Sequence, residues 1–274
     1  MEKIWHVACM GTNDLIQQLQ ENQIQYDCEE ELSSLFGWIY FDISEQNPAF
    51  LHIRELCGSN AILTYKVLFT SSELKSAKWL TFKSRIDKID LVREDTTFFC
   101  TEFFGDGKAH HRYLSGKPFY VSRPPKHTKQ QHFFSSCTAT SCLFCTAHAK
   151  QSLQEFSGAV EYEPVFRSST NMPVGDLFYM NFRETIPKIA IDLANVEEVF
   201  ICPVCQKQTY LPPIQLHIDK EYLSNAVDFY KTDDIFSYGG NFAFCMNIVP
   251  QRVYRAFIEK GIHRGLEFTP VKLV

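Results

Sequence analysis

Two short cysteine pairs constrain the fold of this chain more than any other feature of its sequence. They are Cys142-Leu-Phe-Cys145 and Cys202-Pro-Val-Cys205, and in each pair two residues separate the thiols. Two such pairs offer four thiolates, which is the ligand set that tetrahedral Zn²⁺ takes in a closed structural site. The sequence therefore predicts a zinc-ribbon-like site of Cys142, Cys145, Cys202 and Cys205 that joins two distant segments of the chain.

The surroundings of the second pair favour structural zinc over redox chemistry. A thioredoxin-like dithiol normally lies between a strand and a helix. Here a strand-like run at 199–201 precedes the pair and another at 206–211 follows it, which is the order of a zinc knuckle between two strands. Cys137 and His148 lie close enough to the first pair to replace one ligand. A redox pair and ordinary buried thiols remain the alternative interpretations.

The composition predicts a core that forms without the metal. The chain has 274 residues, of which 45% are hydrophobic and 24 are phenylalanine, enough for one large domain or two of ordinary size. No segment approaches the ~20 apolar residues of a membrane span, and no cleavable leader pattern is present. We therefore expect a cytoplasmic protein without membrane contact. The remaining cysteines are scattered, mostly in apolar runs, as buried thiols of a reducing compartment are: Cys9, Cys28, Cys57, Cys100, Cys137 and Cys245.

Charge is distributed unevenly along the chain. The formal net charge is −5, yet the window 107–154 contains no Asp or Glu, seven Lys or Arg, and five of the nine histidines. Aromatic residues lie between these cations, and cations with stacking rings are the ingredients of single-strand nucleic-acid binding. A zinc-ribbon nucleic-acid-binding protein that uses 107–154 is therefore one functional hypothesis. A solvated linker whose rings enter the core is the other interpretation of this window.

The pattern of apolar residues predicts an α+β fold with mostly antiparallel sheets and a few isolated helices. Glycines and prolines concentrate in 107–131, which disfavours helix there. We therefore predict an N-terminal α+β region at 1–106, a basic, histidine-rich linker or loop at 107–131, and a C-terminal zinc-ribbon α+β region at 132–274. The clearest helix is expected to have Pro250 in its first turn and to end before Gly261.

The sequence contains no motif that indicates catalysis. A Gly-rich phosphate loop, a nucleophile elbow and a His-Glu-x-x-His helix are all missing from it. Four thiolates also leave a metal no open position for a water molecule. The acidic run Glu29-Glu30-Glu31 is interpreted first as a solvated helix end, with an acid–base pair or an acidic surface for a basic partner as alternatives. We expect the protein not to be an enzyme.

The C-terminal segment resembles a known family. The run Asn247-Ile-Val-Pro-Gln-Arg-Val-Tyr-Arg-Ala-Phe-Ile-Glu-Lys-Gly-Ile-His-Arg-Gly-Leu-Glu-Phe-Thr-Pro-Val is similar to the close of several bacterial immunity proteins from polymorphic toxin systems. There a strand leads into a helix and then into a Gly-Leu-x-Phe-x-Pro-Val ending, and members with two Cys-x-x-Cys pairs occur. This chain differs at Pro250, where serine is usual, and at Gln206, where glycine is usual.

The resemblance implies a non-catalytic cytoplasmic protein that binds one cognate secreted toxin domain and occludes its active site. It also implies that Zn²⁺ is structural and fixes the shape of the interface. The acidic balance outside 107–154 suits a basic toxin surface through electrostatic complementarity. Neither the residues nor the resemblance names the toxin-binding residues.

Overall fold

The structure is a computed structural model that describes residues 2–28, 37–58, 61–86, 88–92, 118–126, 130–136, 139–187, 189, 198–201, 208–236 and 244–274. Two compact units are present, Met1–Glu73 and Leu74–Val274. Both combine helices with sheets whose strand pairs are mostly antiparallel. The α+β class expected from the sequence is confirmed for this part of the chain.

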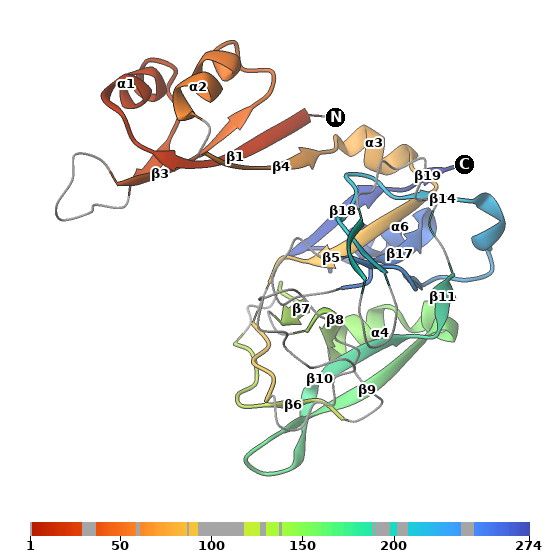
Figure 1. Cartoon of the computed structure of the whole chain (residues 1–274). Coiled ribbons are helices and arrows are strands. Elements are labelled where there is room, and N and C mark those ends of the chain that lie inside the picture. Colours follow the sequence, from red (N-terminus) through yellow and green to blue (C-terminus); the bar gives the residue numbers. More distant parts are fainter. Residues whose placement is uncertain are drawn as a thin grey trace. The chain divides into compact units, whose positions relative to one another are not determined.

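The first unit alternates strands and helices around one sheet (Figure 1). The order along the chain is β1 (Glu2–Met10), α1 (Asn13–Glu21), β2 (Tyr26–Cys28), β3 (Trp38–Ser44), α2 (Phe50–Cys57) and β4 (Ile62–Leu68). The sheet order is β2-β3-β1-β4, and every neighbouring pair is antiparallel. This is the split βαβ arrangement, in which two strand–helix–strand crossovers interlock.

Both helices of this unit pack on the same face of the sheet. Alternate side chains of a strand point to opposite faces, and Ile39, Phe41 and Ile43 of β3 are buried in one core cluster with residues of both helices. Helix α1 contributes Leu15 and Leu19, which share a face because they are four positions apart. Thr12 caps this helix by accepting a 3.2 Å hydrogen bond from the Leu15 amide.

The second unit is built on two five-stranded sheets. One has the order β6-β9-β10-β8-β7 and the other the order β11-β15-β17-β5-β18. Their strands are β5 (Trp79–Ser84), β6 (Tyr120–Val121), β7 (Phe133–Ser136), β8 (Ala139–Thr146), β9 (Val160–Arg167), β10 (Met172–Phe182), β11 (Glu184–Ile186), β15 (Tyr230–Thr232), β17 (Asn247–Pro250) and β18 (Leu266–Pro270).

Short elements complete the second unit. A three-stranded sheet has the order β12-β13-β16, and a two-stranded one joins β14 to β19. The bounds are β12 (Glu198–Ile201), β13 (Gln208–Tyr210), β14 (His217–Ile218), β16 (Ile235–Phe236), β19 (Lys272–Leu273), α3 (Ser71–Ser76, which spans the boundary between the units), α4 (Ala147–Ser152), α6 (Gln251–Glu259), and the 3-10 helices η2 (Gln154–Ala159) and η3 (Lys220–Tyr222).

A phenylalanine-rich core joins the two large sheets. Phe82 of β5 has its ring centroid 5.6 Å from Phe257 of α6 and 6.2 Å from Phe182 of β10. The same cluster includes Phe133 and Cys145 from β7 and β8. A separate cluster covers the opposite face of the β8 sheet. Strand β8 is therefore buried on both of its faces.

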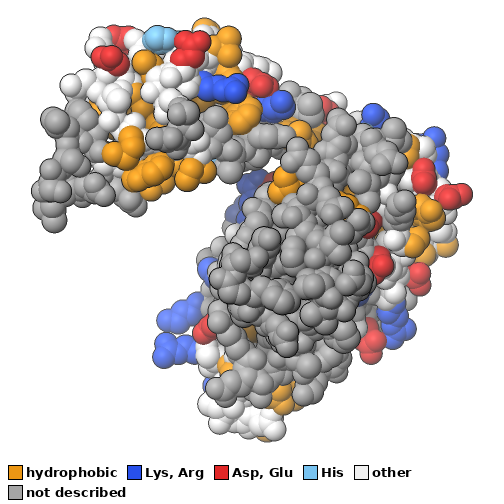
Figure 2. Space-filling view, in the orientation of Figure 1, with side chains coloured by type: hydrophobic (Ala, Val, Ile, Leu, Met, Phe, Trp, Pro, Cys, Tyr) orange, Lys and Arg blue, Asp and Glu red, His pale blue; other side chains and the backbone are white. Residues whose placement is uncertain are grey.

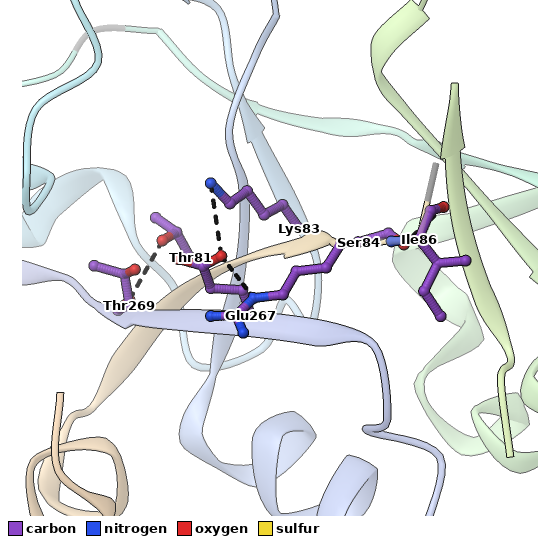
Figure 3. Close-up of polar contacts among 7 residues, drawn as sticks. Thr81, Lys83, Ser84, Ile86, Glu267 and Thr269 are labelled. Carbon is purple, nitrogen blue, oxygen red and sulfur yellow. Dashed lines mark hydrogen bonds and ion pairs between the residues drawn. The ribbon is translucent and has the colours of Figure 1, made fainter. Parts of the chain in front are cut away.

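Polar side-chain contacts join the paired strands β5 and β18 (Figure 3). The Glu267 carboxylate lies 2.9 Å from Arg85 Nε and 3.8 Å from Lys83 Nζ. Thr81 Oγ1 donates a 3.4 Å hydrogen bond to the carbonyl of Thr269. Because β5 pairs with both β17 and β18, a strand from the first third of the sequence completes the C-terminal sheet.

This pairing places the division of the chain earlier than the sequence indicated. We predicted a first region at 1–106, but the boundary lies between Glu73 and Leu74. Of the predicted linker, 107–131, only residues 118–126 and 130–131 are described. Phe119 and Val121 in this part are buried in the second unit.

The C-terminal helix agrees with the sequence prediction. Pro250 precedes α6, and Gly261 follows its end with a φ of +67°, the left-handed conformation that a C-terminal glycine supplies. Val253, Ala256 and Phe257 face the core. Local signals at both ends fix this helix.

Candidate functional site

The first cysteine pair does not have the geometry of a metal knuckle. Cys142 and Cys145 lie in strand β8, and side chains three positions apart in a strand point to opposite faces. Cys142 packs in one cluster with Phe119 and Phe144, whereas Cys145 packs in the other with Phe133. The expectation that both sulfurs turn toward one point is therefore wrong for this pair.

Both thiols of that pair are surrounded by apolar side chains. Cys142 is 4% exposed and Cys145 is fully buried. Burial raises the pKa of the Cys145 thiol well above its ordinary value, because a thiolate loses hydration there. Tyr179 lies beside Cys142, and its pKa is also raised chiefly by burial. Such cysteines behave as small apolar residues.

The remaining predicted ligands are only partly described. Cys202, Cys205 and Cys137 lie outside the described residues. The strands that flank the second pair are present, since β12 and β13 form an antiparallel pair with Ile201 opposite Gln208. His148 is exposed on α4, with its ring 4.7 Å from that of His132.

The predicted four-cysteine site is thus not supported by its described half. Within the described ranges no group of three or more His, Cys, Asp or Glu side chains is arranged to hold a metal. Cys142 and Cys145 do not fit a single Zn²⁺ ion in this fold, because each faces a different core. Any contribution of the 202–205 pair to zinc binding stays a prediction.

The basic window supplies few exposed rings to stack on nucleic acid. Phe119, Phe133 and Phe134 are all buried, so these predicted stacking residues are core residues. Tyr120 is half-buried in β6. The doublet His110-His111 and Tyr113 lie outside the described residues. The described part of the window therefore agrees with the interpretation in which its rings enter the core.

A different surface, which the sequence analysis did not identify, has the features of a binding site. The face of the first unit's sheet opposite the helices carries exposed apolar side chains. Figure 2 shows hydrophobic side chains along the side of this unit where Figure 1 draws the sheet. By strand alternation this open sheet face includes Glu2, His6, Ala8, Met10, Asp27, Trp38, Tyr40, Asp42, Ile62 and Leu68. Met10 is 47% exposed and Ile62 is 59% exposed.

A hollow of about 250 Å³ lies in the middle of the open sheet face. Ala8 pairs with Tyr40 across β3 and with Ile62 across β4. The methyl side chain of Ala8 is much shorter than the side chains of Tyr40 and Ile62. The hollow therefore lies above Ala8, between these two side chains. His6 and Asp42 line the same hollow, and His6 Nδ1 contacts the Asp42 carboxylate.

The first unit also carries the excess negative charge of the chain. Residues 1–73 contain eleven Asp or Glu and three Lys or Arg, a formal net charge of −8. The other 201 residues contain 21 acidic and 24 basic residues, a net charge of +3. Glu2 and Asp27 share the open sheet face with Asp42 by strand alternation. The sequence signal for this surface was the alternation within Trp38–Ser44, which puts Tyr40 and Asp42 opposite Ile39, Phe41 and Ile43.

The two cationic side chains described in this unit, Lys3 and Arg54, lie toward the face of the sheet that the helices cover. Lys3 Nζ is 3.7 Å from Glu45. By strand alternation the side chain of Lys3 is on the helix side of the sheet. The Arg54 guanidinium, on α2, lies 6.0 Å from the ring centroid of Trp5. The side chain of Lys66, the third cation of this unit, is not among those described. The described open sheet face is therefore acidic and apolar.

Comparison with protein-family models, curated proteins and solved structures finds no match for this chain. Among the described helices, none is long and apolar enough to cross a membrane.

Proposed function

We propose that this chain is an immunity-type inhibitor that binds a basic domain of a cognate secreted bacterial toxin in the cytoplasm and blocks its active site without catalysing a reaction. The observation that carries the proposal is the coincidence of two properties on one small unit. Residues 1–73 hold a net charge of −8, and their sheet leaves an apolar face open. An apolar centre with a charged surround is the usual anatomy of a protein–protein interface.

The negative charge of this unit favours association with a basic partner. Opposite net charges raise the rate of encounter and disfavour partners of the wrong sign. Toxins that act on nucleic acids or nucleotides need basic surfaces to hold phosphate, and an acidic protein that covers such a surface excludes the substrate.

The C-terminal resemblance supports the same class of function. Residues 247–271, which resemble the end of bacterial immunity proteins, form strand β17, helix α6 and strand β18. They lie in the second unit, which packs around a core of its own. In this proposal the second unit is a scaffold, and inhibition depends on the first unit.

The test is to search the genes next to this one for a secreted toxin, and to co-express the chain with the domain of that toxin. We expect the chain to restore growth of cells that express the toxin domain and to form a complex with it that weakens as salt is added, because exposed ion pairs are screened. No complex at low salt, together with no rescue of growth, would exclude the proposal.

Single-stranded nucleic-acid binding is the second candidate, and one observation favours it. Trp38 and Tyr40 lie two positions apart on the open side of a central strand in a four-stranded sheet. RNA-binding sheets of this layout stack bases on aromatic residues placed in that way. The net charge of −8 opposes it, since phosphate binding depends on cations. Fluorescence anisotropy with labelled oligonucleotides at low salt separates the two functions.

A further inference from the structure

We infer that the hollow in the open sheet face binds an arginine side chain of the partner. This inference rests on the proposed function and deepens it, because it names the site and the chemical group recognised there. It depends on three features of the described residues, namely the space above the methyl group of Ala8, the groups that line that space, and the sign of the surrounding charge.

The space exists because a small residue stands between two large ones. Ala8 lies at the centre of the sheet, with Tyr40 on one side and Ile62 on the other. The hollow of about 250 Å³ lies on the face of the sheet away from the helices, because its lining includes His6, Ala8, Tyr40, Asp42 and Ile62. A long, slender side chain from a partner can enter it without any movement of the backbone.

The lining suits a guanidinium group. The ring of Tyr40, which is 39% exposed, offers a face for a cation. The carboxylate of Asp42 accepts hydrogen bonds at both oxygens, so a guanidinium can join the contact that His6 makes. Arginine fits better than lysine because its planar group stacks on a ring while it donates to a carboxylate.

The surroundings strengthen this contact. Met10 and Ile62 provide exposed apolar area beside the hollow, and apolar neighbours exclude water from a central polar contact. By strand alternation, two other described charged side chains lie on this face, and both are acidic: Glu2 and Asp27. Asp27 lies opposite Tyr40, so a cation that enters the hollow is attracted by the carboxylates of both Asp42 and Asp27.

The experiment uses the full-length, ¹⁵N-labelled chain and two probes, a short arginine-rich peptide and a lysine-rich peptide of the same length. We expect the arginine peptide to shift the amide resonances of residues 6, 8, 40, 42 and 62, and to bind at least about threefold tighter than the lysine peptide. Shifts that spread over the acidic surface and are equal for both peptides would overturn the inference.

Matched variants separate the hollow from general charge. Asp42→Asn and Glu55→Gln each remove one negative charge, but Glu55 is exposed on α2, away from the open sheet face. We expect Asp42→Asn and Tyr40→Leu to weaken the arginine peptide about threefold or more, and Glu55→Gln to change its affinity much less. Equal effects of Asp42→Asn and Glu55→Gln would overturn the inference, and so would unchanged affinity in Tyr40→Leu.

Two further results distinguish this inference from the proposed function. If the toxin domain binds the chain but Asp42→Asn and Tyr40→Leu leave that affinity unchanged, the hollow is not the site, while the inhibitor proposal survives. If sedimentation shows that the free chain forms a dimer that Ile62→Lys dissociates, a second copy occupies this face and the inference is overturned. Thermal melts of each variant establish that the first unit stays folded.

Discussion

At the scale of single residues, the absence of a side chain at Gly265 permits a close contact within the second unit. Its φ is +86°, and a Cβ atom added there would lie 2.3 Å from Ile86 Cδ1 and 2.8 Å from Ile86 Cγ1. The Gly265 carbonyl also accepts a 2.7 Å hydrogen bond from the Arg85 amide. The glycine therefore allows the turn before β18 to approach the end of β5.

A pair of glycine substitutions tests this account. We expect Gly265→Ala to lower the free energy of unfolding by about 1–3 kcal/mol, from backbone strain and displacement of Ile86. Gly261→Ala is the control, because its φ is +67° but nothing lies within 4 Å of the added Cβ. Urea denaturation should show that Gly265→Ala costs about 1 kcal/mol more. Equal costs would mean that Ile86 moves aside freely.

The two cysteines of β8 give a second prediction at this scale. Because Cys142 and Cys145 are buried in separate clusters, we expect serine at either position to destabilise the second unit by about 1–3 kcal/mol, the cost of a poorly paired buried hydroxyl. The zinc content of the purified protein should be the same as in the wild type. Loss of one equivalent of zinc from either variant would contradict the strand geometry of β8.

At the scale of elements, we expect substitutions on the two faces of the first unit to affect toxin binding differently, although each face carries an exposed apolar side chain. Ile62 on β4 is 59% exposed on the open sheet face, and Leu51 on α2 is 68% exposed on the helix side. Lysine at either position adds the same charge to the same unit. We expect Ile62→Lys to weaken binding of the toxin domain about tenfold or more, as interface positions do, and Leu51→Lys to change it little. Isothermal titration measures both, and a larger effect at Leu51 would move the interface to the helices.

Elements with local signals were predictable from the sequence, and those with distant partners were not. Helix α6 begins after Pro250 and ends before Gly261, and helix α1 begins after Thr12, because caps lie next to the helices they bound. The pairing of β5 with β17 and β18 joins residues more than 150 positions apart, and no local pattern encodes it. The boundary near residue 73 was missed for that reason.

The candidate site was missed for a different reason. Strand β3 begins with four apolar or aromatic residues in a row, Trp38 to Phe41, and this run obscures the alternation of Tyr40 and Asp42 with buried residues. The first cysteine pair was interpreted as a knuckle from its spacing alone. Its neighbours Leu143 and Phe144 are both buried, which is the pattern of a strand covered on both faces. Spacing defines a chelating pair only when the backbone between the cysteines turns.

At the scale of the whole molecule, the position of the boundary predicts how the chain can be divided. The first unit has its own core, and β5 belongs to the sheet of the second. We expect fragments 1–73 and 74–274 each to unfold cooperatively when made separately. Fragment 107–274 should fail to fold, because it lacks the strand between β17 and β18. A cooperative melt of 107–274 would contradict the assignment of β5.

The central claim is that the open sheet face of the first unit contacts a basic partner, and hydroxyl-radical footprinting of the complex with the toxin domain tests it most directly. Met10 is 47% exposed and Tyr40 is 39% exposed on that face, while Met172, at 63% exposure in the second unit, serves as the internal reference. The account predicts that complex formation slows oxidation of Met10 and Tyr40 and leaves Met172 unchanged. Protection confined to residues 74–274, with Met10 and Tyr40 oxidised as fast as in the free chain, would contradict it.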